Sequence, residues 1–436
     1  MPVFTSSIEV TADYPTIKPS LNLNFARSRA LDPRITFTRA SVGTYVGRDG
    51  LVKTAGEDEA RFDYDPETLE SLGLLLEDSR TNLCINSTAS SNWGTPFQLT
   101  KSASKTITAP SGDIDAYEWT ETTDSTTHLN NGPTITITSG SSYSISSFFK
   151  KTAGTVDRGY FLQWYKSGGQ TVKVTYLPST DTTSISTSGG ASAPTNVSVV
   201  TYPNGWYKIS FTATLAETSA LAIVGLSDAS GNTSFTGDTS VKHSFWGLQY
   251  EAGAFPTSYI PTSGSNATRA RDDATIVGES FNSFYNQNEG SLFVESTPMY
   301  LASGINHRVC VITGDSNFTD SNAPGGINVD YDGTTLRTEL FGGSPNSAQQ
   351  GTGLTVSTGT KNKLAYGLET NNVSVIVNGT QVGSTDTSAP MPDPMTKMGI
   401  GRRPDISTTY ADGIHVSSIQ YYPKRLTNAQ LQLLTS

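Results

Sequence analysis

The sequence has 436 residues, and at about 150 residues per domain this length predicts roughly three domains, each large enough to bury its own core. Charged residues make up only 16% of the chain, and the abundant Gly, Ser, Thr, Asn and Tyr favour strands and tight turns over helices. The net charge is −10 and the basic residues form no long run, which argues against a nucleic-acid partner because phosphate binding needs a basic patch.

The ends of the chain and its apolar runs bear on targeting. The start, MPVFTSSIEVT, has neither the basic leader nor the apolar stretch of a signal peptide, and the apolar run at residues 72–76 is far shorter than a membrane span. We therefore expect a protein that is made in the cytoplasm and has no membrane partner. Cys84 and Cys310 are expected to be separate, reduced and buried thiols.

The first part of the chain reads as an arm followed by short strands. Residues 1–33 show no sustained hydrophobic period, which predicts an extended arm that must lie against another surface to be ordered. An Asp49-Gly50 pair predicts a hairpin over residues 44–53. The continuous leucine run at 72–76 predicts a strand that is buried on both faces.

An ordered series of motifs covers about residues 35–85: FTRASVGTYV, GLVKTA, ARFDYDP and SLGLLLEDSRTNL. It resembles a module that recurs in bacteriophage virion proteins, especially tail fibres and related appendages. In that module an Arg-Phe-Asp-x-Asp-Pro turn precedes a Gly-Leu-Leu-(Leu or Ile)-Glu strand and an Arg-Thr-Asn exit. The resemblance implies a structural part of a virus particle in which residues 1–85 dock to other virion proteins or to copies of the chain. It implies no chemistry for these residues.

Residues 86–263 contain many short alternating segments separated by Gly, Pro, Asn and Ser, which predicts a β-sandwich or jelly roll. In detail they resemble the carbohydrate-binding-module-like jelly rolls of phage fibres. There a Ser-x-Tyr-x-x-Ser strand, a Tyr-Pro-Asn-Gly-Trp-Tyr turn and a closing Trp-Gly-x-Gln-x-Glu-x-Gly strand recur in this order. The same motifs lie here at residues 142–151, 202–210 and 246–253. The resemblance implies the fold and, less directly, glycan binding.

A sugar is recognised by an exposed aromatic face together with a few polar groups that fix its orientation. Strand alternation in GYFLQWY gives two opposite faces: Tyr160, Leu162 and Trp164 on one, and Phe161, Gln163 and Tyr165 on the other. One set must face outward. Tyr160 and Trp164 are the candidate glycan-binding residues, but burial of this pair in the core is the favoured interpretation. Trp206 is expected to be a core residue.

The third part begins after a polar crossing, with the boundary at about residues 262–268. Near the C-terminus, GIHVSSIQYYP predicts a strand, and LTNAQLQLLTS predicts a short helix with Thr427 or Asn428 as its N-cap. Residues 264–436 resemble the concanavalin A-like, laminin-G-like sandwich, which ends in a strand and helix of this kind. The three predicted domains are thus 1–85, 86–263 and 264–436.

The sandwich class includes lectin-like binders and endoglucanases, so catalysis must be weighed. Retaining glycosidases need two carboxyl groups about 5–5.5 Å apart, and the Glu-x-Asp-x-x-Glu strand of the sandwich glucanases does not occur in the sequence. The nearest acidic strand, NVDYDG, places Asp330 and Asp332 on one face; we favour an Asp-Gly turn there over a calcium site. No cofactor is expected, with calcium at this pair as the open alternative. The four histidines lack zinc-site spacing.

Together these features predict an all-β chain: an N-terminal arm and small β module, a β jelly roll, and a concanavalin A-like β-sandwich ending in a short helix. The expected function is that of a non-enzymatic structural protein of a tailed bacteriophage virion, assembled in the host cytoplasm. It would be a tail fibre or surface appendage that binds host-surface polysaccharide in several copies, with a homotrimer favoured. Two alternatives remain open: a capsid-surface decoration or cement protein, and a glycan depolymerase of the sandwich glucanase type.

Overall fold

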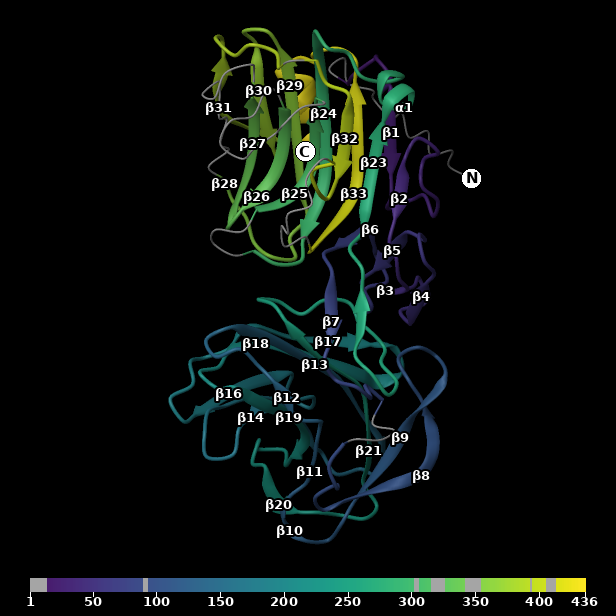
Figure 1. Cartoon of the computed structure of the whole chain (residues 1–436), viewed down its shortest axis with the longest axis vertical. Helices are drawn as coiled ribbons and strands as arrows, with labels where there is room; N and C mark the ends of the chain where they lie inside the picture. Colours follow the sequence, from purple (N-terminus) through teal and green to yellow (C-terminus); the bar gives the residue numbers. More distant parts are fainter. Residues whose placement is uncertain are drawn as a thin grey trace, which may run out of the picture. The chain divides into compact units, whose positions relative to one another are not determined.

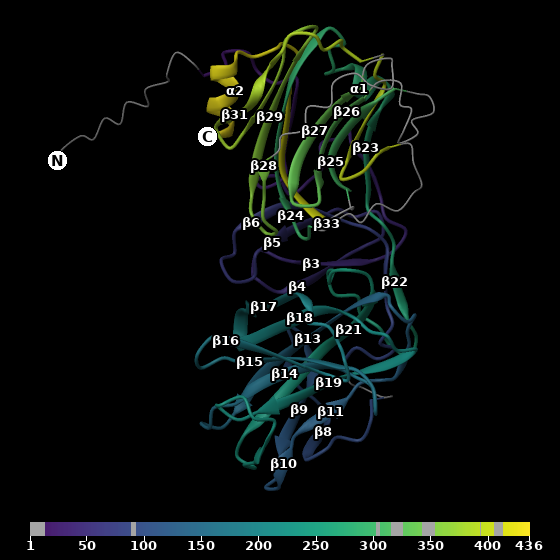
Figure 2. The same cartoon turned by 90° about the vertical axis from the view of Figure 1, so that its left-hand side faces the viewer.

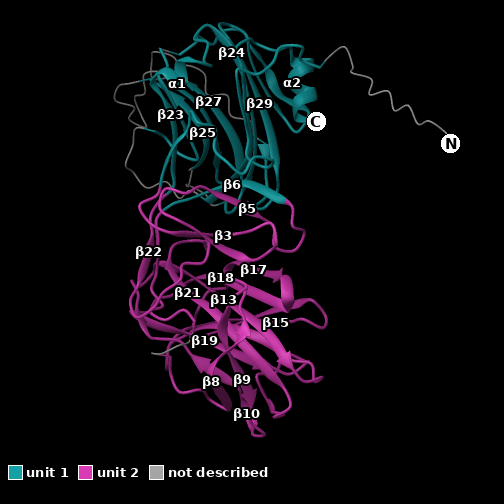
Figure 3. Cartoon of the chain, turned by 90° about the vertical axis from the view of Figure 1, so that its right-hand side faces the viewer, with its two compact units in different colours: residues 1–38, 71–78, 272–436 teal, residues 39–70, 79–271 magenta. Residues whose placement is uncertain are grey.

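The computed structural model describes residues 14–88, 93–301, 306–314, 326–341, 354–392, 394–404 and 413–436. These residues form two compact units (Figure 3). Unit 1 contains the described residues of 14–38, 71–78 and 272–436, and unit 2 contains those of 39–70 and 79–271. This grouping differs from the predicted three-part division in residues 1–85, which contribute strands to both units. The predicted all-β architecture with a short C-terminal helix is confirmed.

Unit 1 is a sandwich of two antiparallel sheets (Figure 1). The first, called the β33 sheet, runs in the order β31 (Thr380–Asp386), β30 (Val373–Val377), β29 (Asn362–Glu369), β24 (Glu289–Pro298), β33 (Gly413–Tyr422), β6 (Ser71–Glu77). The second, called the β26 sheet, runs in the order β2 (Thr36–Thr38), β23 (Asp273–Val277), β32 (Lys397–Ile400), β25 (Asn306–Thr313), β26 (Gly326–Asp332), β27 (Thr335–Phe341), β28 (Leu354–Thr355). A short helix, α1 (Gly278–Asn282), follows β23.

Strand β33 collects two strands from the N-terminal part of the chain. β1 (Leu21–Asn24) pairs with its second half, and β6 pairs with its first half. Leu21 and Leu23 are buried because β1 turns its apolar side toward the core. The predicted arm is therefore bound to its own chain from Ser20 onward, where the Ser20 N–H donates to the Tyr421 carbonyl at 2.8 Å. Residues 1–13 lie outside the described residues. The leucine-rich strand expected at 72–76 is confirmed as the buried strand β6.

The C-terminal helix, α2 (Asn428–Thr435), follows β33 and packs beside β29 and β30 (Figure 2). The N-cap is Thr427, which is one of the two residues predicted for this position. The Thr427 hydroxyl accepts from the backbone N–H of Gln430, and the Gln430 side chain accepts from the N–H of Thr427. This reciprocal capping satisfies two amides that the first helical turn would leave unpaired. Leu431 then packs into a cluster that includes Phe293 and Ile376.

Unit 2 is built on two further sheets. The β13 sheet runs in the order β17 (Thr195–Tyr202), β18 (Trp206–Thr214), β13 (Ser142–Ala153), β21 (Lys242–Ala252), β9 (Ile114–Glu121), β8 (Leu99–Thr108). The β14 sheet runs in the order β11 (Leu129–Asn131), β19 (Ser219–Ser227), β14 (Gly159–Tyr165), β15 (Thr171–Leu177), β16 (Thr182–Ser188), with β12 (Ile135–Thr136) also on β19. Three short pairs complete the unit: β3 (Gly43–Val46) with β4 (Val52–Ala55), β7 (Arg80–Asn82) with β22 (Ala267–Arg269), and β10 (Ser125–Thr127) with β20 (Ser234–Thr236).

The β13 and β14 sheets enclose one hydrophobic core. A second core lies against the opposite side of the β13 sheet. Val46 and Val52 of the β3–β4 hairpin pack there with Trp206, Trp246 and other rings of the sheet. Trp206 is 0% exposed, which confirms it as a core residue. The hairpin predicted over residues 44–53 is also confirmed. The β3–β4 hairpin thus covers this side of the β13 sheet.

Two motifs of the sequence hold this cover in place. Arg61, from the ARFDYDP motif and β5 (Arg61–Tyr64), is fully buried and donates to the Thr44 carbonyl at 3.0 Å and to the Ser258 hydroxyl at 2.9 Å. The segment that follows β21 is also held by a hydrogen bond to a side chain of that strand. The N–H of Ile260 donates to the side chain of Gln249 at 2.6 Å. Arg61 and Gln249 therefore have structural roles within unit 2.

Candidate functional site

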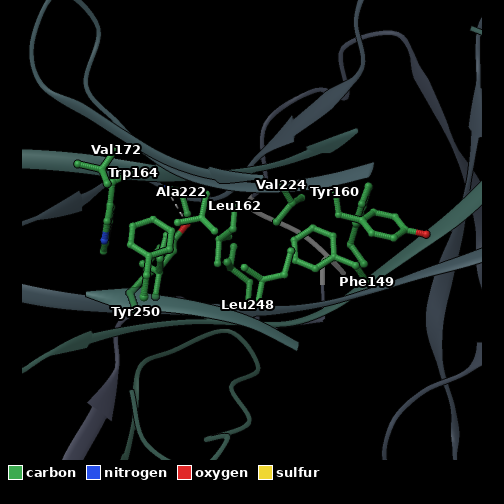
Figure 4. Close-up of a cluster of buried hydrophobic side chains, with 14 of the residues drawn as sticks. Phe149, Tyr160, Leu162, Trp164, Val172, Ala222, Val224, Leu248 and Tyr250 are labelled. Atoms are coloured by element: carbon green, nitrogen blue, oxygen red, sulfur yellow. Dashed lines mark hydrogen bonds between the residues drawn. The ribbon is translucent and has the colours of Figure 1, made fainter. Parts of the chain in front are cut away.

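Tyr160 and Trp164 lie between the two sheets of unit 2 (Figure 4). Their relative exposures are 1% and 0%. The ring centroid of Trp164 is 5.3 Å from that of Tyr250, and the centroid of Tyr160 is 5.4 Å from that of Phe149. Both partners belong to the β13 sheet. Neither predicted glycan-binding residue offers a ring face to a ligand, so the prediction is corrected: the pair belongs to the hydrophobic core.

The opposite side of the same strand carries a different kind of surface. We call it the polar face and define it by five half-buried residues on the outer side of the β14 sheet: Asn131, Gln163, Tyr165, Thr171 and Lys173. Gln163 lies opposite Lys173, and Tyr165 lies opposite Thr171, across the β14–β15 pair. Residues opposite each other on adjacent antiparallel strands have Cβ atoms about 4.5–5.5 Å apart. The face therefore presents side chains within reach of one ligand.

Several polar groups on this face are not committed to the protein. The Gln163 amide and the Tyr165 hydroxyl make no hydrogen bond within the part of the chain that the structure describes. The Lys173 ammonium lies 5.6 Å from the ring centroid of Phe161, a cation–π contact. Partial burial of this ammonium group lowers the pKa of Lys173, because desolvation disfavours the charged form. A planar amide, a phenol and an ammonium group are thus available to bind a ligand.

The floor of the polar face is closely packed. Phe161 is 1% exposed although it lies on the outer side of β14. It lies opposite Gly225 of β19, and a Cβ atom at Gly225 would come within 2.3 Å of the Phe161 ring. Only a residue without a side chain leaves room for the ring there. This packing fixes the strands that carry Gln163 and Tyr165, as a rigid binding surface requires.

Sequence reasoning found part of this face. The alternation in GYFLQWY places Gln163 and Tyr165 together on one side of the strand, whereas Asn131, Thr171 and Lys173 were missed. The alternation in TVKVTYL would have placed Thr171 and Lys173 on one side of β15. The pairing of β14 with β15 could not be read from the sequence, so nothing joined the two sets.

Asp330 and Asp332 belong to a cluster of ion pairs on the β26 sheet. Asp330 is 0% exposed and lies opposite Arg308 on β25 and Arg337 on β27. Arg337 donates to both oxygens of Asp330, at 3.0 and 3.1 Å, and Arg308 also pairs with this carboxylate. Arg337 reaches the Asp332 carboxylate at 3.1 Å. The carboxylate oxygens are thus bonded to guanidinium groups.

This arrangement does not fit a calcium site, so the candidate metal ligands are corrected to partners in an ion-pair cluster. Among the described residues, no group of three or more His, Cys, Asp or Glu side chains is placed to hold a metal ion. The arrangement also gives no support to a glycosidase pair, because Asp330 is buried and Glu339, 5% exposed, is paired with the same two arginines. The favoured turn is present: Gly333 after β26 has a φ of +56°.

A second buried ion-pair cluster lies in unit 2. The guanidinium of Arg158 donates to both oxygens of Glu121 at 2.9 Å, and His243 Nε2 lies 3.0 Å from Glu121 Oε1. Burial alone would raise the pKa of Glu121, but hydrogen bonds from His243, Arg158 and the Asp238 N–H lower it to about 2. Burial lowers the pKa of His243. Since the Glu121 and His243 side chains are both 0% exposed, we infer that this cluster stabilises the fold and does not bind a ligand.

The remaining predicted features are structural as well. Cys84 and Cys310 are free and buried, as expected, and burial raises the pKa of Cys84 to about 12. Such thiols are poor nucleophiles because little thiolate is present near neutral pH. None of the helices in the described ranges is long and apolar enough to span a membrane.

Comparison with known proteins gives no family for the chain. No family model matches it, and no curated protein matches it. Among solved structures it is similar to domain 4 of an extracellular arabinanase from Geobacillus stearothermophilus in complex with arabinotriose, with 16% identity, 42% of this chain and 84% of that chain covered, and a TM-score of 0.29. It is also similar to the CBM40 of a Ruminococcus gnavus sialidase bound to alpha2,3 sialyllactose, with 12% identity, 36% and 88% covered, and a TM-score of 0.28.

A third similar structure is the Trypanosoma rangeli sialidase in complex with sialic acid, with 12% identity, 73% of this chain and 60% of that chain covered, and a TM-score of 0.29. At these identities and TM-scores the likenesses assign neither a ligand nor an activity to the chain.

Proposed function

We propose that the chain is a non-enzymatic structural protein of a tailed bacteriophage virion that binds host-surface polysaccharide through the polar face of unit 2. The observation that carries the glycan-binding part is that the Gln163 amide and the Tyr165 hydroxyl make no hydrogen bond within the described chain and lie beside Lys173 on closely packed strands. Sugar hydroxyls need donors and acceptors fixed in position, and a phenol ring supplies an apolar surface for sugar C–H groups.

The virion part of the proposal rests on the ordered motifs of residues 35–85 and the three motifs of the jelly roll. Their structural roles within the two units are compatible with any position on a particle. A tail fibre or surface appendage is proposed because a polysaccharide-binding face is useful where the particle meets its host. Single sugar sites bind weakly, so several copies would raise the avidity. The homotrimer expected from the sequence remains a prediction, and a two-fold pair of chains would replace it.

The direct test measures binding of purified host-surface polysaccharide to the full chain by calorimetry or biolayer interferometry. The wild type should bind, and Gln163→Ala combined with Lys173→Ala should weaken binding by at least about tenfold, because two polar contacts are lost. Lys18→Ala is the matched control, since it removes an exposed lysine of unit 1. Lack of wild-type binding would remove the receptor-binding role and leave the capsid decoration or cement alternative.

The depolymerase alternative is tested on the same samples. Incubation with the polysaccharide should produce no new reducing ends, because the Asp330 carboxylate is buried and paired with two arginines. New reducing ends that disappear in an Asp330→Ala, Asp332→Ala double variant would replace the non-enzymatic proposal with a hydrolytic one. A circular dichroism spectrum must accompany that variant, because removing Asp330 leaves buried arginines without their partner.

A further inference from the structure

The edge strand β16 of unit 2 is unusually open to pairing. It ends the β14 sheet, and each of its seven residues, Thr182–Ser188, is exposed. Its register with β15 is unbroken at all seven positions, so the strand is regular along its whole length. Its other edge pairs with no strand of the described chain.

Edge strands in soluble proteins are commonly protected by charged residues, proline, a bulge or short length. β16 reads TTSISTS, with no charge and no proline. Strand β15, in contrast, carries Lys173. An unprotected edge of this length presents unpaired backbone N–H and C=O groups with which a strand of another chain can form hydrogen bonds.

The sequence of β16 is nearly the same in both directions. Read outward from Ile185, it has Ser184 and Ser186, then Thr183 and Thr187, then Thr182 and Ser188. Two copies of such a strand can pair antiparallel with Ile185 opposite Ile185. All six remaining positions of each strand then place a Ser or Thr opposite a Ser or Thr of the other copy. No charge meets a like charge in this register.

The same kind of hydroxyl pair recurs inside this chain. Among the described residues, registered Ser or Thr residues on adjacent strands bond to each other through their hydroxyls at 2.6–2.8 Å in five places: Thr171 with Ser188, Ser125 with Thr236, Ser142 with Thr214, Ser144 with Thr212, and Thr81 with Thr268. All five are cross-strand partners in antiparallel pairs. A β16 pair would repeat a contact that the fold already uses.

We propose that β16 pairs antiparallel with β16 of a second copy of this chain, about a two-fold axis at Ile185. The pairing satisfies the open backbone edge in both copies. It also brings together the two Ile185 side chains, each 49% exposed in the single chain, and so removes apolar surface from water. An interface of this kind is isologous: the same patch is used on both sides, which gives pairs of chains.

The two-fold axis has a consequence for the polar face. A two-fold axis perpendicular to the sheet keeps the outer faces of both copies on the same side. Ser184, Ser186 and Ser188 are the β16 partners of Thr175, Lys173 and Thr171, so they continue the outer surface toward the axis. The two Lys173 positions would lie three strand spacings apart across the sheet and two residues apart along it, about 16 Å in all. The inference itself does not depend on glycan binding.

The test uses the full chain without any glycan. Sedimentation equilibrium over a wide concentration range should show a reversible monomer–dimer equilibrium, weak because a two-strand contact is small for a protein interface. Ile185→Lys should weaken the dimer by at least about tenfold, since two like charges would face each other at the axis. Ile114→Lys is the matched control: it makes the same change at an isoleucine that is 67% exposed on β9, and it should leave the dimer unchanged.

Mixing provides a second arm that reports the geometry directly. Ile185→Lys and Ile185→Glu should each be monomeric alone and should form a heterodimer when mixed, because opposite charges then meet across the axis. This recovery also shows that both variants are folded. A monomeric wild type, a trimer as the only oligomer, an unaffected Ile185→Lys variant, or a mixture that stays monomeric would each overturn the proposal.

Discussion

The two faces of strand β14 belong to one seven-residue segment, yet their side chains differ in burial. Tyr160, Leu162 and Trp164 are 0–1% exposed and face the β13 sheet, whereas Gln163 and Tyr165 are half-buried on the outer side. The neighbours explain the difference. The inward positions of β15 and β19 are apolar, as in Val172 and Val224, and the outward positions of β15 include Thr171 and Lys173. An aromatic residue in an alternating strand is therefore interpretable only with its cross-strand partners.

The largest effect is expected from emptying the buried face. Trp164→Ala should lower the free energy of unfolding of unit 2 by about 3–5 kcal/mol, because it removes a fully buried indole and leaves a cavity. Denaturant unfolding followed by circular dichroism measures this. Trp164→Phe should cost less, since the indole N–H has no hydrogen-bond partner to lose among the described residues. Equal losses in the two variants would contradict the role of Trp164 as a space-filling core residue.

A second prediction concerns the buried charge of Glu121, which is bound by Arg158 and His243. The pKa of Glu121 is 4.5 in an ordinary setting and about 2 in the fold. Its contribution is present above pH 4.5 and should be lost as the pH falls toward 2, by about 2–3 kcal/mol. His243, whose pKa burial lowers from 6.5, acts in the same direction because the unfolded chain takes up its proton first.

Unfolding curves recorded across that pH range test the acid prediction. Glu121→Gln should be less stable at neutral pH and should show a flatter acid dependence, because the carboxylate that binds Arg158 is gone. A wild type whose stability is unchanged between about pH 5 and pH 2 would show that this cluster contributes no acid-sensitive stability.

A third and smaller effect concerns the floor of the polar face. Gly225→Ala should destabilise unit 2 by about 1–3 kcal/mol, because the new methyl group would overlap the Phe161 ring. Gly140→Ala is a comparison with open space around the Cβ position, although its φ of +78° carries a backbone cost of its own. If Gly225→Ala is neutral, the Phe161 side of β14 is looser than the structure indicates.

Much of the fold was predictable because the relevant signals are local. The Asp49-Gly50 hairpin, the leucine strand β6 and the Thr427 cap each depend on a few adjacent residues. The partner of the N-terminal arm was not predictable, because the pairing of β1 with β33 joins residues about 400 positions apart in sequence. No local pattern encodes a contact of that range.

The sites were predicted less well, for a related reason. The alternation of β14 was correct, but deciding whether Tyr160 and Trp164 face outward or into the core required knowledge of what covers each face. Asp330 and Asp332 do lie at alternate positions of one strand, but Arg308 and Arg337 come from two other strands. The charge partners decide whether an acidic pair binds a cation or an arginine, and they become visible only once the sheet is assembled.

The smallest structural effect is expected at the outer face, where it should coincide with a clear loss of binding. Tyr165→Ala should change the stability of unit 2 by less than about 1 kcal/mol, because its side chain is half-buried and its hydroxyl makes no hydrogen bond within the described chain. Affinity for host-surface polysaccharide should fall about tenfold, since the ring of Tyr165 is the proposed apolar contact.

The measurement that tests the central claim most directly is the affinity of Tyr165→Ala for this polysaccharide beside that of Tyr14→Ala, in which an exposed tyrosine of unit 1 is removed. The polar face predicts about a tenfold loss for Tyr165→Ala and wild-type affinity for Tyr14→Ala. Equal affinities in the wild type and both variants would contradict a glycan-binding role for the polar face.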